Sequence, residues 1–178
     1  MKTNTRMLVL SALFAALTAV GGFLKIPVGV SSFTLQFLFT ALAGVLLGPR
    51  YGALSQAGYV LLGLAGVPVF TLGGGLGYLL QPTCGFLLGL IPAAWVVGKL
   101  AGETGRPGRV MAAALAGLGV LYLVGIPYMY AVLDLYLGRG MTWGQVLMAG
   151  MVLFLPWDAL KIAAAGLAAK PLLRAVRR

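Results

Sequence analysis

Apolar residues run along this chain in long uncharged stretches, separated by short segments rich in glycine, proline and basic residues. A helix needs about 20 apolar residues to cross the hydrocarbon core of a bilayer. Residues 51–98 carry no charge and are too long for one helix, so we place a break in the Gly/Pro-rich segment 66–77. The pattern then predicts six membrane-spanning helices, at 7–24, 34–48, 51–65, 78–99, 110–133 and 156–175.

A shorter helix is predicted just before the last span. Thr142-Trp143-Gly144-Gln145 matches a capping box, in which Thr and Gln side chains satisfy free N–H groups at a helix start. We expect a short interfacial helix near 142–154. Pro156 suits the first turn of the next helix, where its missing N–H costs nothing. The sequence thus predicts an all-α integral membrane protein with one membrane-embedded domain spanning 1–178.

Composition supports this class, and the placement of charge predicts the orientation. The chain is 61% hydrophobic and 9% charged, whereas soluble domains carry about 25% charged residues. Lys25 and Arg139 fall on one side of the predicted spans and Lys161 falls within one. Ten basic residues fall on the other side: Lys2, Arg6, Arg50, Lys99, Arg106, Arg109, Lys170, Arg174, Arg177 and Arg178. Because cytoplasmic loops are rich in Lys and Arg, both termini are predicted to be cytoplasmic.

Several function classes are disfavoured. The net charge of +10 is spread over short loops and termini, which is not the basic face that binds nucleic acid. One cysteine and no histidine exclude an intrachain disulfide and a Cys/His metal site, so we expect no metal, no cofactor and no catalytic residues. Residues 73–77 are glycine-rich but lack the Lys-Ser/Thr ending of a phosphate loop. Residues 1–20 resemble a signal peptide, but no convincing cleavage site follows, and we expect a retained first helix.

Asp158 and Lys161 are the strongest candidates for chemistry. Three residues apart on a helix, they share one face. Charges within membrane segments cost at least ~2.5–3.5 kcal/mol each and are usually functional. Two interpretations stay open: a site for a ligand or ion, or an internal structural pair, since an acid also suits a first helical turn and a lysine can reach the interface.

Other polar and small residues are weaker candidates. Gln36, Gln81 and Thr83 open predicted spans on the same side as Asp158, and could line a pocket or cap helices. Ala12 with Ala16, and Ala15 with Ala19, have the small-xxx-small spacing that allows close helix approach. In so Gly- and Ala-rich a chain, most such pairs serve internal packing.

An ordered set of segments resembles the BioY family, the biotin-specific substrate-binding (S) components of energy-coupling factor (ECF) transporters. The resemblance covers most of the chain, although Trp157 stands where the family commonly has glycine and Phe86 where it commonly has tyrosine. The segments are Thr34-Leu35-Gln36, Leu47-Gly48-Pro49-Arg50-Tyr51-Gly52, Tyr59, Gly63-Leu64-Ala65-Gly66-Val67-Pro68-Val69-Phe70, Pro82-Thr83-Cys84-Gly85-Phe86 and Pro156-Trp157-Asp158-Ala159-Leu160-Lys161.

This resemblance implies a multi-pass protein of the cell membrane that captures biotin on the outer side. It also implies partners: a transmembrane coupling (T) component, which the first helix contacts through Ala12, Ala15, Ala16 and Ala19, and two cytoplasmic ATPases that alone use ATP. Asp158 and Lys161 would bind the ureido ring, while Lys25 and Arg139 are on the correct side for the carboxylate. The remaining candidate contacts are Gln36, Gln81, Thr83, Gly85, Tyr59, Phe70 and Tyr128.

Two alternatives remain open: an S component for another vitamin, or a solitary ion-coupled carrier of small molecules. A membrane enzyme and a purely structural scaffold are disfavoured. An enzyme would need two placed acid–base groups, for which this chain offers only Asp158 with Lys161. A scaffold is disfavoured because charges within membrane segments are usually functional.

Overall fold

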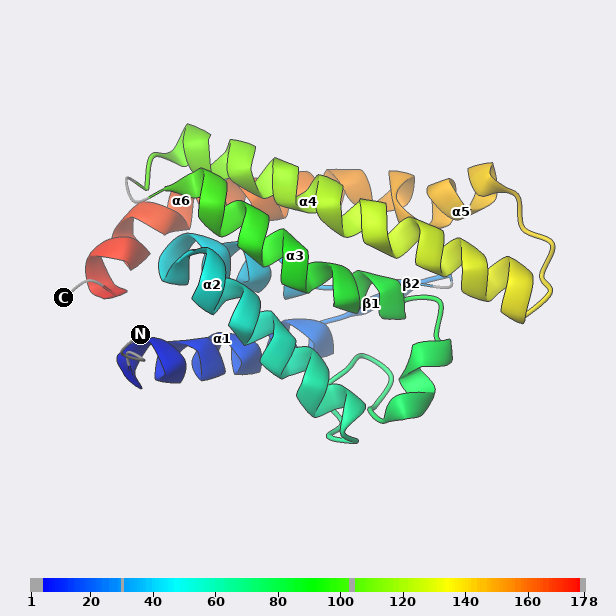
Figure 1. Cartoon of the computed structure of the whole chain (residues 1–178). Coiled ribbons are helices and arrows are strands. Elements are labelled where there is room, and N and C mark those ends of the chain that lie inside the picture. The colour runs from blue at the N-terminus through cyan, green and yellow to red at the C-terminus, as the bar shows by residue number, and fades with distance from the viewer. Residues whose placement is uncertain (1–4, 30, 103–104, 177–178) are drawn as a thin grey trace.

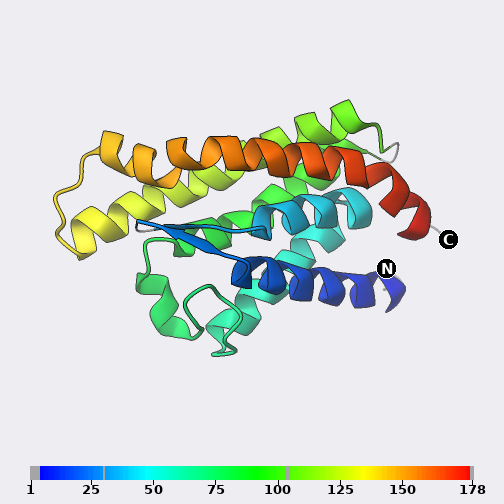
Figure 2. The ribbon, with the colours of Figure 1, turned by 180° about the vertical axis from the view of Figure 1, so that it is seen from behind.

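The computed structural model describes residues 5–29, 31–102 and 105–176, and it is an elongated bundle of helices (Figure 1). Both ends of the chain lie at the same end of the bundle (Figures 1 and 2). The elements in chain order are α1 (Thr5–Phe23), β1 (Ile26–Val28), β2 (Ser31–Phe33), α2 (Gln36–Leu64), the 3₁₀ helix η1 (Leu76–Leu80), α3 (Cys84–Ala101), α4 (Pro107–Tyr130), the π-helical segment η2 (Ala131–Tyr136), α5 (Trp143–Gly150), the 3₁₀ helix η3 (Val152–Phe154) and α6 (Leu155–Val176).

Helix α2 is interrupted where two separate spans were predicted. Gly48 has φ 78° and ψ 178°, a backbone conformation that favours glycine, and Pro49 follows it. A Cβ on Gly52 would lie 2.9 Å from Gly44 Cα, whereas in a straight helix these residues would be about 12 Å apart. The chain therefore folds back at Gly48, and α2 consists of two antiparallel segments.

Helix α3 begins later than predicted. The expected span 78–99 is divided, because residues up to Leu80 form η1 and α3 starts only at Cys84. Gln81 is extended, with φ −83° and ψ 134°. The residue before a proline is disfavoured in the helical region, so Pro82 separates the two helices.

The second half of the chain agrees more closely with the predicted elements. The expected span 110–133 corresponds to α4 and η2, and 156–175 corresponds to α6. The capping box is confirmed: Thr142 N donates to Gln145 Oε1 at 2.9 Å, and Gln145 N donates to Thr142 Oγ1 at 3.4 Å. The helix that it starts is α5, followed by η3.

Among the described residues, five helical stretches are long and apolar enough to cross a membrane: Thr5–Phe23, Gln36–Leu64, Cys84–Ala101, Pro107–Tyr136 and Trp143–Val176. Large apolar side chains such as Leu61, Leu123 and Leu167 are more than 60% exposed, as expected where a helix faces lipid tails.

Small residues set how closely the helices pack. α3 contacts both α2 and α4, and α6 packs against α2 and α4. A Cβ on Gly44 would lie 2.6 Å from the Ala94 carbonyl oxygen, and one on Gly98 would lie 2.5 Å from Pro49 N. These glycines let the backbones of α2 and α3 approach each other.

The connection between α1 and α2 is a β-hairpin, which the sequence did not predict. β1 and β2 pair antiparallel, with Ile26 opposite Phe33 and Val28 opposite Ser31. The hairpin extends from the end of α1 along the half of the bundle away from the termini (Figure 2). Its second strand forms part of the wall of the pocket described next.

Candidate functional site

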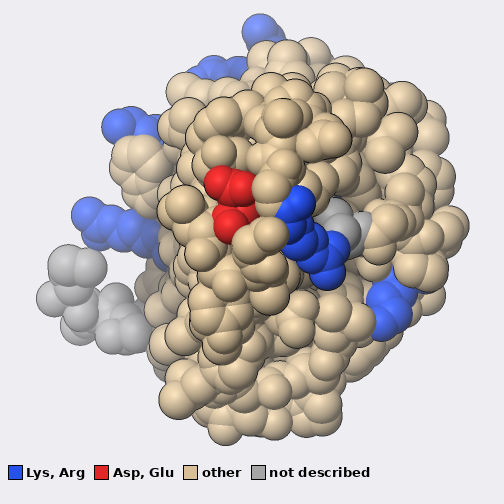
Figure 3. Space-filling model, turned by 90° about the vertical axis from the view of Figure 1, so that its right-hand side faces the viewer, with Lys and Arg blue, Asp and Glu red and all other residues tan. Residues whose placement is uncertain are grey.

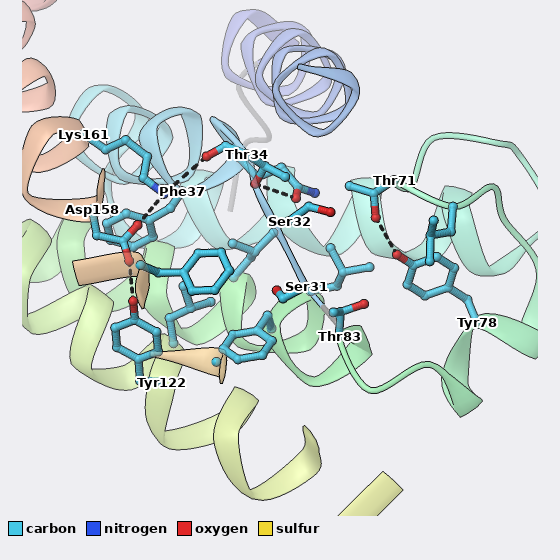
Figure 4. Close-up of a pocket in the computed structure, with 18 residues that line it drawn as sticks. Ser31, Ser32, Thr34, Phe37, Thr71, Tyr78, Thr83, Tyr122, Asp158 and Lys161 are labelled. Carbon is cyan, nitrogen blue, oxygen red and sulfur yellow. Dashed lines mark hydrogen bonds and ion pairs between the residues drawn. The ribbon is translucent and has the colours of Figure 1, made fainter. Parts of the chain in front are cut away.

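A pocket lies in the half of the bundle away from the termini, between the β-hairpin and helices α3, α4 and α6 (Figure 4). The space between its walls, its open mouth included, measures about 800 Å³. The end of the molecule opposite the termini is mostly uncharged on its surface (Figure 3). The lining residues are Ser31, Ser32, Thr34, Gln36, Phe37, Thr71, Leu72, Tyr78, Thr83, Phe86, Leu87, Leu90, Leu121, Tyr122, Gly150, Phe154, Asp158 and Lys161.

One side of the pocket holds a buried ion pair. Asp158 and Lys161 are in the first two turns of α6, are 4% and 7% exposed, and form a salt bridge between Asp158 Oδ1 and Lys161 Nζ. Tyr122 Oη, from α4, donates to Asp158 Oδ2. Lys161 Nζ also donates to the Thr34 carbonyl oxygen at 3.2 Å.

These contacts compensate each buried charge. A buried ion that loses its partner is strongly destabilising, and here the carboxylate has two donors and the ammonium has two acceptors. Three elements hold the pair in place: α6 through its own spacing, α4 through Tyr122, and the chain entering α2 through Thr34. The arrangement offers a charged acceptor beside a charged donor to whatever enters the pocket.

Gln36, at the start of α2, connects the pocket through Tyr59 to the loop between α2 and η1. Gln36 Nε2 donates to Tyr59 Oη at 2.7 Å, and Tyr59 Oη donates to the Val69 carbonyl oxygen at 3.2 Å. Thr34 Oγ1 donates to Gln36 Oε1 at 3.0 Å. The start of α2 is thereby fixed to the loop that carries the lining residue Thr71.

The opposite side of the pocket is lined by hydroxyl groups. Thr71 Oγ1 and Tyr78 Oη lie 2.8 Å apart, and Figure 4 shows them well away from Asp158 and Lys161. Ser31 and Thr83 lie on the same side as Thr71 and Tyr78 (Figure 4). Between the two polar ends, the wall is apolar: Phe37, Phe86, Leu87, Leu90, Leu121 and Phe154.

Four of the predicted ligand contacts line this pocket: Asp158, Lys161, Gln36 and Thr83. Gln81 is exposed and does not line it. Neither Gln81 nor Thr83 caps α3 through its side chain: the N-cap residue Thr83 makes no such hydrogen bond.

The three aromatic candidates for ligand contact, Tyr59, Phe70 and Tyr128, do not line the pocket. Tyr59 and Phe70 are each 1% exposed and pack edge-to-face behind it, with ring centroids 5.5 Å apart. A Cβ on Gly85 would lie 2.3 Å from Tyr128 Cβ, and Tyr128 Oη donates to the Leu79 carbonyl oxygen. Gly85 and Tyr128 thus join α3 to α4, since the close approach needs a residue without a side chain.

The alanines of α1 divide into two faces. Ala15 and Ala19 are buried, 8% and 7% exposed, in the core around the pocket. Ala12 and Ala16 are exposed on the opposite face. The spacing that pairs Ala15 with Ala19 therefore serves internal packing, and the Ala12–Ala16 face is open to a partner.

Tyr122 and the Thr34 carbonyl are site groups that the sequence did not single out. Tyr122 lies three residues before Gly125 on the same face of α4, and Gly125 meets α3 closely: a Cβ there would lie 2.3 Å from Phe86. A glycine at that spacing could have marked Tyr122 as inward-facing. No sequence signal marks a backbone carbonyl.

Metal-binding side chains do not gather at this pocket. In the part of the chain that the structure describes, no group of three or more His, Cys, Asp or Glu residues could hold a metal ion.

Among the described residues, Trp157 Nε1 is a buried side-chain nitrogen without a hydrogen-bond partner. Its ring lies beside Phe33, with centroids 5.8 Å apart.

Comparison with known proteins identifies the family. The sequence profile of the BioY family matches residues 1–178. The chain belongs to the BioY family. It is 46% identical over 151 residues to the probable biotin transporter BioY of Lysinibacillus sphaericus, covering 84% of this chain and 77% of that protein. It is 38% identical over 165 residues to the biotin transporter BioY of Thermotoga maritima, covering 92% and 94%.

A solved structure of a biotin S component has the same fold. The crystal structure of the S-component for biotin from an ECF-type ABC transporter superposes with a TM-score of 0.82 at 25% identity, over 98% of this chain and 95% of that one. As a BioY-family member with five apolar helical stretches among its described residues, the chain is a multi-pass protein of the cell membrane. The family is one of transporter S components and not of enzymes.

Proposed function

We propose that this protein captures biotin on the outer side of the cell membrane and acts as the S component of an ECF-type transporter. Its membership of the BioY family and its likeness to a biotin S component support this function. Energy for uptake comes from partners: a transmembrane coupling protein and two cytoplasmic ATPases.

The observation that carries the proposal is the buried array of Lys161, Asp158 and Tyr122 in a pocket with apolar walls. The ureido ring of biotin has two N–H donors and one carbonyl acceptor. Asp158 can accept from an N–H, and Lys161 can donate to the carbonyl. Hydrogen bonds to charged groups contribute roughly 1.5–3 kcal/mol each, so this pair supplies both affinity and orientation.

Other pocket residues have supporting roles in this proposal. Gln36 and Thr83 contact the ligand directly from the starts of α2 and α3. Tyr59 holds Gln36 in place and fixes Val69 in the loop that carries Thr71. The apolar wall receives the fused rings and the alkyl chain.

We further propose six membrane spans with both termini in the cytoplasm. The fold-back at Gly48 supports two crossings within α2, which with α1, α3, α4 and α6 gives six. At the end away from the termini, Lys25 and Arg139 are the described basic residues. At the terminal end, the described basic residues are Arg6, Arg50, Lys99, Arg106, Arg109, Lys170 and Arg174. That asymmetry is typical of a cytoplasmic terminal end, and it supports a pocket that opens toward the outside.

The coupling protein is proposed to dock on the exposed Ala12–Ala16 face of α1. Small side chains four residues apart allow a partner helix to approach closely within the membrane. Ala15 and Ala19 support this surface from the core side rather than touching the partner.

Calorimetry on the purified protein tests the proposed function. Biotin and a panel of other vitamins are titrated into the detergent-solubilised protein under identical conditions. We expect saturable, one-site binding of biotin and none of the other vitamins. Binding of another vitamin in place of biotin, or of no vitamin at all, contradicts the proposal.

A further inference from the structure

We propose that the carboxylate of the ligand binds among the hydroxyls of Ser31, Thr71 and Thr83, with the ammonium of Lys25 at the rim of this end of the pocket. This inference rests on the proposed function, because it takes the ureido ring to lie at Asp158 and Lys161. It says where the carboxylate end of the ligand binds, and therefore how strongly the protein selects for a carboxylate there.

The first argument is the supply of hydrogen-bond donors. Among the described residues, the hydroxyls of Ser31, Ser32 and Thr83 line the pocket without a hydrogen-bond partner. Thr71 and Tyr78 share one hydrogen bond between two hydroxyls, which leaves a donor free. Each hydroxyl can donate one hydrogen bond, and a carboxylate has about four acceptor positions. A cluster of unpaired, half-buried donors therefore suits the carboxylate.

The second argument is the position of Lys25. It lies between α1 and β1, is exposed, and its Nζ donates to the backbone carbonyl of the lining residue Thr71. The ammonium therefore lies at the rim of the hydroxyl end without lining the pocket. Arg139, the other described basic residue at this end of the molecule, lies between η2 and α5 and does not line the pocket.

The third argument is charge and shape. Asp158 repels a second carboxylate, and the Lys161 ammonium is already paired with Asp158 and the Thr34 carbonyl. The apolar wall between the ends matches an alkyl chain. A ligand with a ureido ring at one end and a carboxylate at the other is thus accommodated in one direction.

This arrangement predicts unequal selectivity at the two ends. The carboxylate meets neutral hydroxyls and one exposed cation, and contacts of that exposed kind contribute little to affinity, about fivefold at most. The primary amide of biotin, which keeps a carbonyl acceptor, should therefore bind within about tenfold of biotin. Changes to the ureido ring should lower the affinity by more than this change to the carboxylate.

The test compares biotin with its primary amide, using Lys25→Met and, as a matched control at the same end of the molecule, Arg139→Met. By calorimetry at low salt, we expect Lys25→Met to weaken biotin roughly twofold to fivefold. The same variant should leave the affinity for the amide unchanged, and Arg139→Met should change neither. Added salt should weaken biotin binding in the wild type but not in Lys25→Met.

A second variant tests the hydroxyls independently of charge. Thr83→Val keeps the shape and removes a donor, so it should weaken both biotin and the amide, but not an analogue whose chain ends in a methyl group. The proposal is overturned if Lys25→Met affects biotin and the amide equally, if it affects neither, or if Thr83→Val weakens the methyl analogue as well. Failure of the wild-type protein to bind biotin would instead overturn the proposed function.

Discussion

Replacing Asp158 with asparagine tests whether the buried pair binds the ligand or only braces the helices. The asparagine side chain would keep the shape and an oxygen acceptor but lose the charge that faces Lys161 and Tyr122. We therefore expect Asp158→Asn to weaken biotin binding. Lys161→Met, which keeps much of the apolar stem, should weaken it to a similar extent.

The magnitude follows from the contacts. One charge-assisted hydrogen bond contributes about 1.5–3 kcal/mol, so each single variant should lose between about tenfold and a hundredfold in affinity. Stability behaves differently. Asp158→Asn leaves the buried Lys161 ammonium with neutral acceptors only, and removing one charge of a buried ion pair costs about 3–5 kcal/mol.

The double variant separates the two effects. Asp158→Asn combined with Lys161→Met removes both charges, so it should be more stable than Asp158→Asn alone while binding biotin no better. Thermal unfolding gives the stability, and calorimetry at matched folded fraction gives the affinity. Unchanged affinity in all three variants would refute a ligand role and leave the pair as a structural brace.

Other contacts and surfaces of the bundle can be tested in the same way. Tyr122→Phe removes the donor to Asp158 Oδ2 and should weaken biotin binding by about tenfold. Tyr130 stacks on Trp143 outside the pocket, so Tyr130→Phe should leave biotin affinity unchanged. Equal affinities in the two variants would contradict a role of Tyr122 in positioning Asp158. Reporter fusions at the C-terminus and at Gly138 should report cytoplasm and exterior, and the same side for both would contradict six spans. Ala16→Leu should lower transport by the assembled transporter while leaving biotin affinity within a few-fold, and an equal loss of affinity would place Ala16 in the protein's own core.

The local features of this protein were predictable from its sequence. The membrane class follows from the density of apolar residues, because a charge-free stretch has only the bilayer or a core to bury it. The capping box at Thr142 was identified correctly because its two partners are three residues apart in the chain. Asp158 and Lys161 were placed on one face of one helix for the same reason.

What involves two distant segments was decided by the tertiary structure alone. Tyr122 reaches Asp158 because α4 and α6 pack together at a particular rotation. Tyr128, the tyrosine of α4 that was predicted as a candidate ligand contact, packs on Gly85 and does not line the pocket. The regular spacing of a helix tells which residues share a face, but not which face meets which neighbour.

The same reason explains the alanines of α1 and the hydroxyl end of the pocket. Ala12, Ala15, Ala16 and Ala19 have similar spacing and chemistry, and only the packing of α1 against α2 buries two of them and exposes the other two. Ser31, Thr71 and Thr83 lie in three connecting segments with no common pattern, and the fold brings them to one end of the pocket. Spacing along the chain determines which residues share a face of a helix. Close contacts at glycines such as Gly44 and Gly98 determine how neighbouring helices pack. That packing decides which residues line the pocket.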